Sequence, residues 1–351
     1  MASTSGTVVV LGTGGTIAGT TAGTTAGTTA GTTAGTTAGI TAANTTGTPS
    51  RSAASTARHT GYQAGVLGAD ALLAAVPALQ GQALEAHTLA RLDSCDMDHG
   101  VWALLAASAA EHLARREVAG VVVTHGTDTL EETAYFLHRT VSAPKPLVLT
   151  AAMRPADALS PDGPQNLFDA VTLARAPGAP GAPGAHGVLV VMAGVVHGGA
   201  DLRKLHGYRV DAFSAGDAGP VALLEDGRLR ALRPWPTMAC HEAASRLSDP
   251  AGWPVVDIVL SHAHADGRII DALVAAGTRG IVIAGTGNGS VHRSLTAAAQ
   301  RALAQGVRVV RASRCWAGGV VGEDPGALPT YGVLTPVQAR IELMLDLMAG
   351  A

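Results

Sequence analysis

Residues 120–137 have the sequence GVVVTHGTDTLEETAYFL, and this stretch decides the fold class. Its first five residues form an apolar, β-branched run that is typical of a strand buried on both faces. A glycine-bearing turn follows at 125–129, and from there we predict a helix through about Val141. A strand, a turn and a helix in this order are typical of a parallel sheet covered by helices.

The same alternation recurs on both sides of this stretch. In the first part of the chain we predict strands at 7–11, 146–150 and 187–192, and helices at 70–76, 102–116 and 165–174. Later we predict strands at 255–260, 280–284 and 307–310, and a closing helix at 336–348. The prediction is an α/β protein with a large N-terminal parallel-sheet domain and a smaller C-terminal α/β domain.

The segment between these two parts contains Pro234, Pro236 and Pro250 and has no hydrophobic periodicity. We therefore expect an N-terminal domain at 1–230, a linker at 231–252 and a C-terminal domain at 253–351.

A low-complexity insertion occupies residues 18–60, where the unit AGTT occurs five times over 18–37. As a helix, this repeat would place a glycine at every fourth residue, each costing about 1 kcal/mol relative to alanine. It offers no large apolar side chain for burial. We expect a mobile loop rather than a regular element.

Composition excludes several classes of protein. The formal net charge is −3, so no basic excess points to nucleic acid. The longest apolar runs fall far short of the roughly 18 residues of a membrane span. The three cysteines form no CxxC motif, and the N-terminus has no basic leader region. These features predict a soluble, reduced, cytoplasmic protein.

Two turns carry the candidate chemistry, and both follow predicted strands. The first, residues 12–16 (GTGGT), fails the dinucleotide pattern GxGxxG because position 17 is Ile, but it presents Thr16 beside backbone amides. Alternatively, it is a plain glycine-rich turn. Parallel strands would bring it to the same sheet edge as the second turn, HGTDT (125–129).

The second turn has an equally simple alternative interpretation. Asp128 or Thr129 could cap the following helix, with Glu131 or Glu132 completing a capping box.

Taken together, these motifs resemble the threonine-dependent bacterial L-asparaginases. The resemblance rests on VVVLGTGGTIAG (8–19), YQAGVLGADALLAAVPAL (62–79), DSCDM (93–97), GVVVTHGTDTLEETAYFL (120–137), AAMRPADALSPDGPQNLFDAV (151–171), DLRK (201–204), IAGTGNGS (283–290) and TPVQAR (335–340). It covers essentially the whole chain apart from 18–60, which then corresponds to an expanded lid loop.

The resemblance implies a role for each matching residue. Thr16 matches the nucleophile, and Tyr62 matches the lid tyrosine that activates it. Thr127, Asp128 and Lys204 match a second catalytic group. The positions that match substrate-binding residues are Gly15, Ser94, Cys95, Asp128 and Ser290, the last of which would reach the site of a neighbouring subunit.

Lysine is so scarce that only one other lysine could be the catalytic amine in place of Lys204. The chain contains only Lys145 and Lys204, and Lys145 lies in an Ala-Pro-Lys-Pro segment that we expect to be exposed. Threonine, tyrosine and lysine all need local activation near neutral pH, because their unperturbed acidities are too weak for nucleophilic or base catalysis.

Three departures from the family pattern stand out. Cys95 replaces a side chain that carries an amide in many members, which puts the preference between asparagine and glutamine in doubt. The lid glutamate has no clean match, and Glu323 is the nearest candidate, beside Asp324. The segment between Thr16 and Tyr62 holds 45 residues, yet the extra loop-closure cost of its repeats is only about 0.5 kcal/mol.

The resemblance implies hydrolysis of L-asparagine to L-aspartate and ammonia through an acyl-enzyme, with L-glutamine as a side substrate and without cofactor or metal. It also implies a homotetramer, a dimer of intimate dimers with sites at the subunit interface. Two alternatives remain. The pair His262 and His264 after a strand could begin the site of a metal-dependent hydrolase, although only His292 follows as a further histidine ligand. The chain could also be a non-catalytic amino-acid-binding module.

Overall fold

The computed structural model describes residues 6–21, 62–63, 65, 67–176, 185–237, 239–322 and 326–350. Most of the low-complexity insertion, residues 22–61, lies outside the described residues, so the predicted mobile loop remains a prediction.

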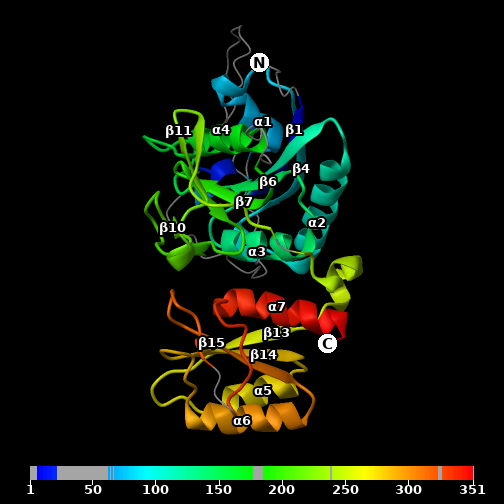
Figure 1. The fold of residues 1–351 in the computed structure, drawn as a ribbon, viewed down its shortest axis with the longest axis vertical. Helices are drawn as coiled ribbons and strands as arrows, with labels where there is room; N and C mark the ends of the chain where they lie inside the picture. The colour runs from blue at the N-terminus through cyan, green and yellow to red at the C-terminus, as the bar shows by residue number, and fades with distance from the viewer. Residues whose placement is uncertain are drawn as a thin grey trace, which may run out of the picture.

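The N-terminal part is built on an eight-stranded sheet in the order β12-β11-β8-β7-β6-β5-β1-β4 (Figure 1). Its strands are β1 (Thr7–Gly14), β4 (Leu84–Leu92), β5 (Val118–Thr124), β6 (Pro146–Thr150), β7 (Gly187–Met192), β8 (Val195–Gly198), β11 (Ala222–Glu225) and β12 (Arg228–Ala231). The strands from β7 to β4 in this order run parallel, as predicted. The pairings β7–β8, β8–β11 and β11–β12 are antiparallel, so the sheet is mixed rather than wholly parallel.

Each face of this sheet is covered by helices. The four are α1 (Ala69–Ala74), α2 (His99–Ala114), α3 (Leu130–Thr140) and α4 (Gly163–Ala174). Along β1, Val8 and Val10 pack in one core cluster with residues of α1 and α4. Val9 and Leu11 pack in the other with residues of α2 and α3. Because successive strand residues point to opposite faces, a run such as VVVL is buried throughout.

Two glycine-bearing turns produce the antiparallel strands. Ala193 and Gly194 join β7 to β8 with φ of 49° and 75°, and Asp226 and Gly227 join β11 to β12 with φ of 54° and 70°. Two consecutive positive φ values define the hairpin turn whose twist matches that of the strands.

Short elements complete the N-terminal part. They are β2 (Thr20–Thr21), β3 (Tyr62–Gln63), β9 (Arg203–Lys204), β10 (Phe213–Ser214) and the 3-10 turns η1 (Thr16–Ala18), η2 (Pro77–Leu79), η3 (Ser94–Asp96) and η4 (Gly216–Ala218). The segment that leads to the second part contains two further 3-10 turns, η5 (Glu242–Arg246) and η6 (Pro250–Gly252).

The C-terminal part is a smaller α/β unit. Its three parallel strands are β13 (Val256–Leu260), β14 (Gly280–Gly285) and β15 (Arg308–Ser313). Helices α5 (Arg268–Ala275) and α6 (Arg293–Ala304) lie on the side away from the N-terminal part, and α7 (Pro336–Ala349) lies between the two parts (Figure 1). A capping box of Thr335 and Gln338 begins α7.

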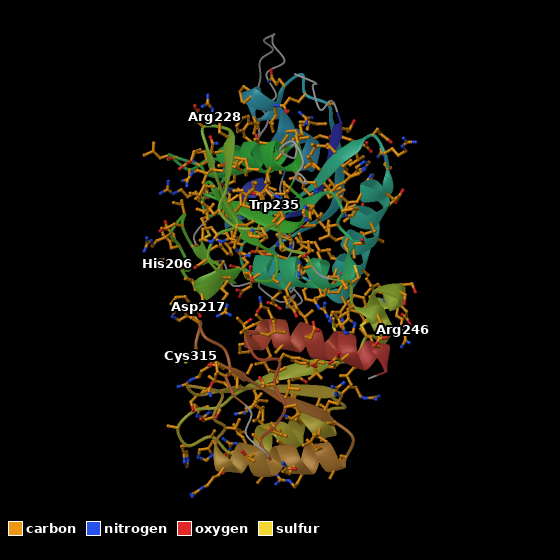
Figure 2. All side chains as sticks on the ribbon, in the orientation of Figure 1. His206, Asp217, Arg228, Trp235, Arg246 and Cys315 are labelled. Atoms are coloured by element: carbon orange, nitrogen blue, oxygen red, sulfur yellow. The ribbon has the colours of Figure 1, made fainter. Side chains whose placement is uncertain are left out.

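One hydrophobic core runs through the junction of the two parts. It joins Leu130 and Phe136 of α3 to Ile341 of α7 and Val282 of β14. An ion pair that is almost fully buried crosses the same junction, since Arg139 Nη2 lies 2.7 Å from Glu342 Oε1. Asp217 and Cys315 are labelled on its two sides (Figure 2), and nearby Gly318 N donates to Asp217 Oδ2 at 3.2 Å.

None of the helices in the described residues has both the length and the apolar character of a membrane span. We propose the domain limits 1–230 and 253–351, with 231–252 as the linker.

Candidate active site

The site lies where β1, β4 and β5 end side by side. β1 pairs with β4 on one side and with β5 on the other, so the connection after β1 leaves in one direction and that after β5 in the other. Such a switch point leaves a crevice beyond the carboxyl ends of the strands. The two turns predicted to carry chemistry, 12–16 and 125–129, both follow strands at this edge.

These two turns touch at a pair of glycines. A Cβ on Gly15 would stand 2.2 Å from Gly126 Cα, and one on Gly126 would stand 2.4 Å from Ser94 Oγ. Gly15 also has φ of 79°, which disfavours any other residue. Thr16 and Thr127 each follow one of these glycines directly, so the contact brings both threonines to the same place.

Ser94, at the start of η3, ties the end of β4 to the second turn. Its Oγ accepts from Asp128 N at 3.0 Å, and its carbonyl accepts from Thr129 Oγ1 at 2.7 Å. The Ser94 hydroxyl hydrogen remains directed elsewhere and can donate to a ligand.

Lys204 reaches the second turn from the short strand β9. Its Nζ donates to Thr127 Oγ1 at 3.0 Å and to Asp128 Oδ1 at 2.7 Å. The lysine side chain is 15% exposed and that of Asp128 is 43% exposed. The other lysine, Lys145, which we expected to be exposed, is half-buried, and its Nζ donates to the carbonyl of Arg115.

Glu131 anchors Lys204, and sequence reasoning assigned it no such role. Its Oε2 accepts from Lys204 N at 2.9 Å. Burial raises the pKa of this carboxyl to about 7, while the N–H of Lys204 acts in the opposite direction. The available sequence signal was an acidic residue two positions after the HGTDT motif.

The capping interpretation of the second turn is wrong. Thr129 is the N-cap of α3, but no side chain caps the helix there. Asp128 is paired with Lys204 instead. Of the backbone amides expected beside Thr16, that of Gly15 is already occupied, because Gly15 N donates to Leu92 O at 2.9 Å.

His125, the first residue of the second turn, is fully buried. Its Nδ1 lies 2.6 Å from Gly126 O, which can only accept, so Nδ1 carries the hydrogen. Its Nε2 therefore accepts from Thr133 Oγ1 at 3.0 Å, and Thr133 accepts in turn from Trp102 Nε1 at 2.9 Å. Complete burial lowers the pKa of His125 to about 4, against a usual 6.5.

This buried histidine predicts a pH-dependent contribution to stability. Between pH 4 and 6.5 the unfolded chain binds a proton that the folded chain does not, so the contribution is present above pH 6.5 and lost toward pH 4. We expect the destabilisation caused by His125→Asn to shrink by about 2 kcal/mol between pH 7.5 and pH 4.5. Urea unfolding of both proteins at the two pH values measures it.

Comparing the variant with the wild type removes the opposite contribution of Glu131, which both proteins share. If the destabilisation caused by His125→Asn is the same at both pH values, the lowered pKa of His125 is contradicted.

Comparisons with known proteins agree over most of the chain. The N-terminal asparaginase family model matches residues 39–236, and the glutaminase/asparaginase C-terminal domain model matches 255–351. The chain belongs to the L-asparaginase family. L-asparaginase 2 of Escherichia coli (strain K12) is 35% identical over 83% of this chain and 84% of its own length. A glutaminase-asparaginase of Pseudomonas fluorescens biotype A is 33% identical over 84% of this chain and 82% of its own length.

A solved structure of an asparaginase shares the fold. The crystal structure of a probable cytoplasmic L-asparaginase from Campylobacter jejuni has a TM-score of 0.79 and 34% identity, covering 97% of this chain and 95% of its own. Thr16 precedes the residues matched by the family models, so its role rests on the geometry of the turn and on the motif.

The structure describes only some of the remaining residues that match functional positions of the asparaginases. The backbone of Tyr62 in β3 pairs with Thr21 in β2, five residues after Thr16. Glu323 lies outside the described residues. Ser290 is exposed in a tight loop after β14, where its N donates to Thr286 O at 2.7 Å. Within the described chain, its hydrogen bonds do not reach the Thr127 group.

Cys95 lies beside the same group. Its Sγ and the carboxylates of Asp93 and Asp128 lie within 4.8 Å of one another. Cys95 also lines a cavity of about 650 Å³ together with Met97, Trp102, Thr129 and Glu132, among others.

The metal-dependent alternative gains nothing from the geometry. His262 and His264 are both exposed, and His262 Nδ1 lies 2.8 Å from Ala263 O. Among the described residues, every cluster of three potential metal ligands leaves both histidines out.

Proposed function

We propose that this protein hydrolyses L-asparagine to L-aspartate and ammonia through an acyl-enzyme on Thr16, with L-glutamine as a secondary substrate. The observation that carries the proposal is the hydrogen bonding of Lys204 to Thr127 and Asp128. The turn that contains Thr127 and Asp128 packs directly against the turn that contains Thr16. The L-asparaginases and glutaminase-asparaginases among the relatives support the same activity.

The reaction would divide between two groups of residues. Thr16 Oγ1 attacks the carbon of the side-chain amide. Tyr62 takes the hydroxyl proton of Thr16 and then passes it to the nitrogen that leaves as ammonia. Water then attacks the resulting ester and releases aspartate from Thr16. Lys204 holds Thr127 by a hydrogen bond and balances the charge of Asp128, and this group polarises the attacking water. Gly15 leaves room for the close approach of the two turns.

Recognition of the amino acid would use the opposite charges of its α groups. The Asp128 carboxylate is half exposed and suits the α-ammonium. The Ser94 hydroxyl still has a hydrogen to donate to the α-carboxylate, because its oxygen accepts from Asp128 N.

The other partners follow the family pattern. We propose a homotetramer, a dimer of intimate dimers, in which Ser290 contacts the substrate bound to a neighbouring subunit and Glu323 supports Tyr62. A cytoplasmic location is supported by the name of the Campylobacter jejuni neighbour, although a Haemophilus influenzae relative is named as periplasmic.

The direct test measures ammonia release from L-asparagine and from L-glutamine by the purified protein. Release that persists in EDTA is expected. Loss of activity in EDTA that added metal restores would favour the metal-dependent alternative over the threonine mechanism.

Cys95→Gln is expected to shift substrate selectivity toward asparagine by about tenfold, while the kcat for asparagine changes less than about twofold. An amide at this position adds a hydrogen bond to the charged α-carboxylate, which is worth about 1.5–3 kcal/mol. The longer side chain also takes space that the extra methylene of glutamine needs. The ratio of kcat/KM for the two substrates measures the shift.

Cys240→Gln is the matched control, since Cys240 is also exposed but lies away from this site, beside α3 and β7. Equal changes for both substrates in Cys95→Gln would contradict a role of Cys95 in selectivity, and unchanged kcat/KM for both would contradict its assignment to substrate binding.

A further inference from the structure

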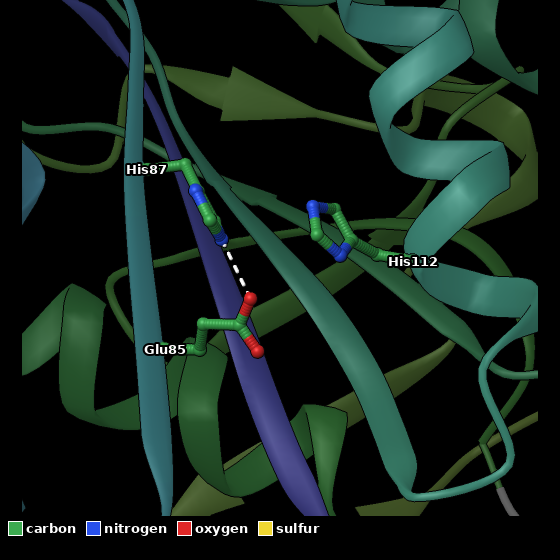
Figure 3. Close-up of side chains that lie close together, drawn as sticks. All are labelled: Glu85, His87 and His112. Carbon is green, nitrogen blue, oxygen red and sulfur yellow. Dashed lines mark hydrogen bonds and ion pairs between the residues drawn. The ribbon is translucent and has the colours of Figure 1, made fainter.

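A cluster of metal-ligating side chains stands apart from the candidate active site. Glu85 and His87 of β4 point to the same face of the strand, toward His112 on α2 (Figure 3). His87 Nε2 lies 2.7 Å from Glu85 Oε1, and the rings of His87 and His112 stack with centroids 5.0 Å apart. One potential ligand atom from each residue lies within 4.8 Å of the other two.

The cluster lies in the first half of β4, whereas the catalytic turns lie beyond the carboxyl end of the strand. Ser94 follows the carboxyl end of the strand, and His87 precedes it by seven residues, which in an extended chain is a distance of about 20 Å. The inference therefore goes beyond the proposed hydrolysis and does not depend on it.

A cation already occupies the point where these side chains converge. Arg115 Nη1 donates to Glu85 Oε1 at 3.0 Å and lies 3.1 Å from His112 Nδ1. Because a guanidinium only donates, His112 Nδ1 must present its lone pair there. The carbonyl end of α2, whose last turn contains His112, adds negative partial charge at the same place.

The ligand atoms suit a metal ion. His112 Nδ1 presents its lone pair toward the Arg115 guanidinium, and the Glu85 carboxylate is already paired with that cation. Neutral imidazole nitrogens and a carboxylate are common ligands of zinc in proteins.

We propose that Glu85, His87 and His112 form a binding site for a divalent transition metal of the zinc type, for which the Arg115 guanidinium competes. Zinc holds nitrogen and oxygen ligands at about 2.0–2.2 Å, whereas the guanidinium holds Glu85 and His112 near 3 Å. These two ligands must therefore close in by about 1 Å each, and His87 must join them, while Arg115 turns away. Three protein ligands leave a fourth position for water.

Isothermal titration with zinc chloride, on protein freed of metal by chelator and gel filtration, tests the site. We expect one equivalent of zinc to bind to the wild type. His87→Ala should weaken binding at least about tenfold, since one of three ligands is lost. Arg115→Gln should tighten it about tenfold, because the competing cation is removed.

His262→Ala is the control, because His262 and His264 form an exposed pair of histidines outside the cluster, and it should leave the affinity unchanged. Circular dichroism checks that each variant is folded, and His87, with 41% of its side chain exposed, is the safest position to change. Binding that survives His87→Ala, or that disappears in His262→Ala, would place the zinc elsewhere. Unchanged affinity in Arg115→Gln would contradict the competition by the guanidinium. A wild type that binds no zinc would reduce the cluster to an ordinary ion-pair network.

Discussion

Replacing Thr16 by alanine is expected to lower the rate of ammonia release from L-asparagine by at least about 10⁴-fold. The methyl group that remains cannot attack the amide carbon, and no covalent intermediate can form. Folding should be unaffected, since Gly15 and Gly126, which bring the two turns together, are unchanged. Single-turnover and steady-state ammonia assays measure the loss.

The same turn provides the control. Thr13 Oγ1 donates to Thr124 O at 3.1 Å and is buried, so Thr13→Val should affect stability more than the catalytic rate. The Thr16→Ala protein should still bind L-aspartate. An active Thr16→Ala variant would overturn the mechanism, and a wild type that binds aspartate but releases no ammonia would identify a binding module.

Lys204→Met is expected to lower kcat by about 10³-fold. It removes the hydrogen bond to Thr127 and leaves the carboxylate of Asp128 without its cation. Because 43% of the Asp128 side chain is exposed, water can hydrate the unpaired charge, and the protein should remain folded. Lys204→Arg should not restore the rate, since a planar guanidinium cannot replace a compact ammonium between these two oxygens.

The only other lysine makes the comparison clean. Lys145→Met removes an equal charge at a distant position, where Nζ bonds to the carbonyl of Arg115, and it should keep at least half of the activity. Similar losses in the two variants would indicate an effect of charge or stability rather than a catalytic role for Lys204.

The sequence predicted the buried parallel strands well, because a strand covered on both faces is apolar throughout. It did not predict β4, in which Glu85, His87 and Arg91 interrupt the apolar pattern of a half-exposed strand at the sheet edge. It also missed the antiparallel strands, although the dipeptide Asp226-Gly227 is a common hairpin signal. These strands are only four residues long, which is too short for a periodicity to be recognised.

Within the site, the meeting of the two turns was predictable from parallel topology alone. The position of Lys204 was not, since it lies 76 residues from Asp128 in the chain and reaches it from a two-residue strand. Only the resemblance and the scarcity of lysine pointed to it. The role of Glu131 depends on the path of the backbone at Lys204, which no local pattern encodes.

The core that passes from α3 to α7 has a consequence for how the molecule unfolds. Separating the two parts would expose Phe136 and Ile341 to water. It would also break the ion pair between Arg139 and Glu342 and leave both charges unpaired. Neither part can open on its own without disrupting the packing of the other. The chain divides into two parts by topology, but we expect the described parts to unfold together as a single cooperative unit.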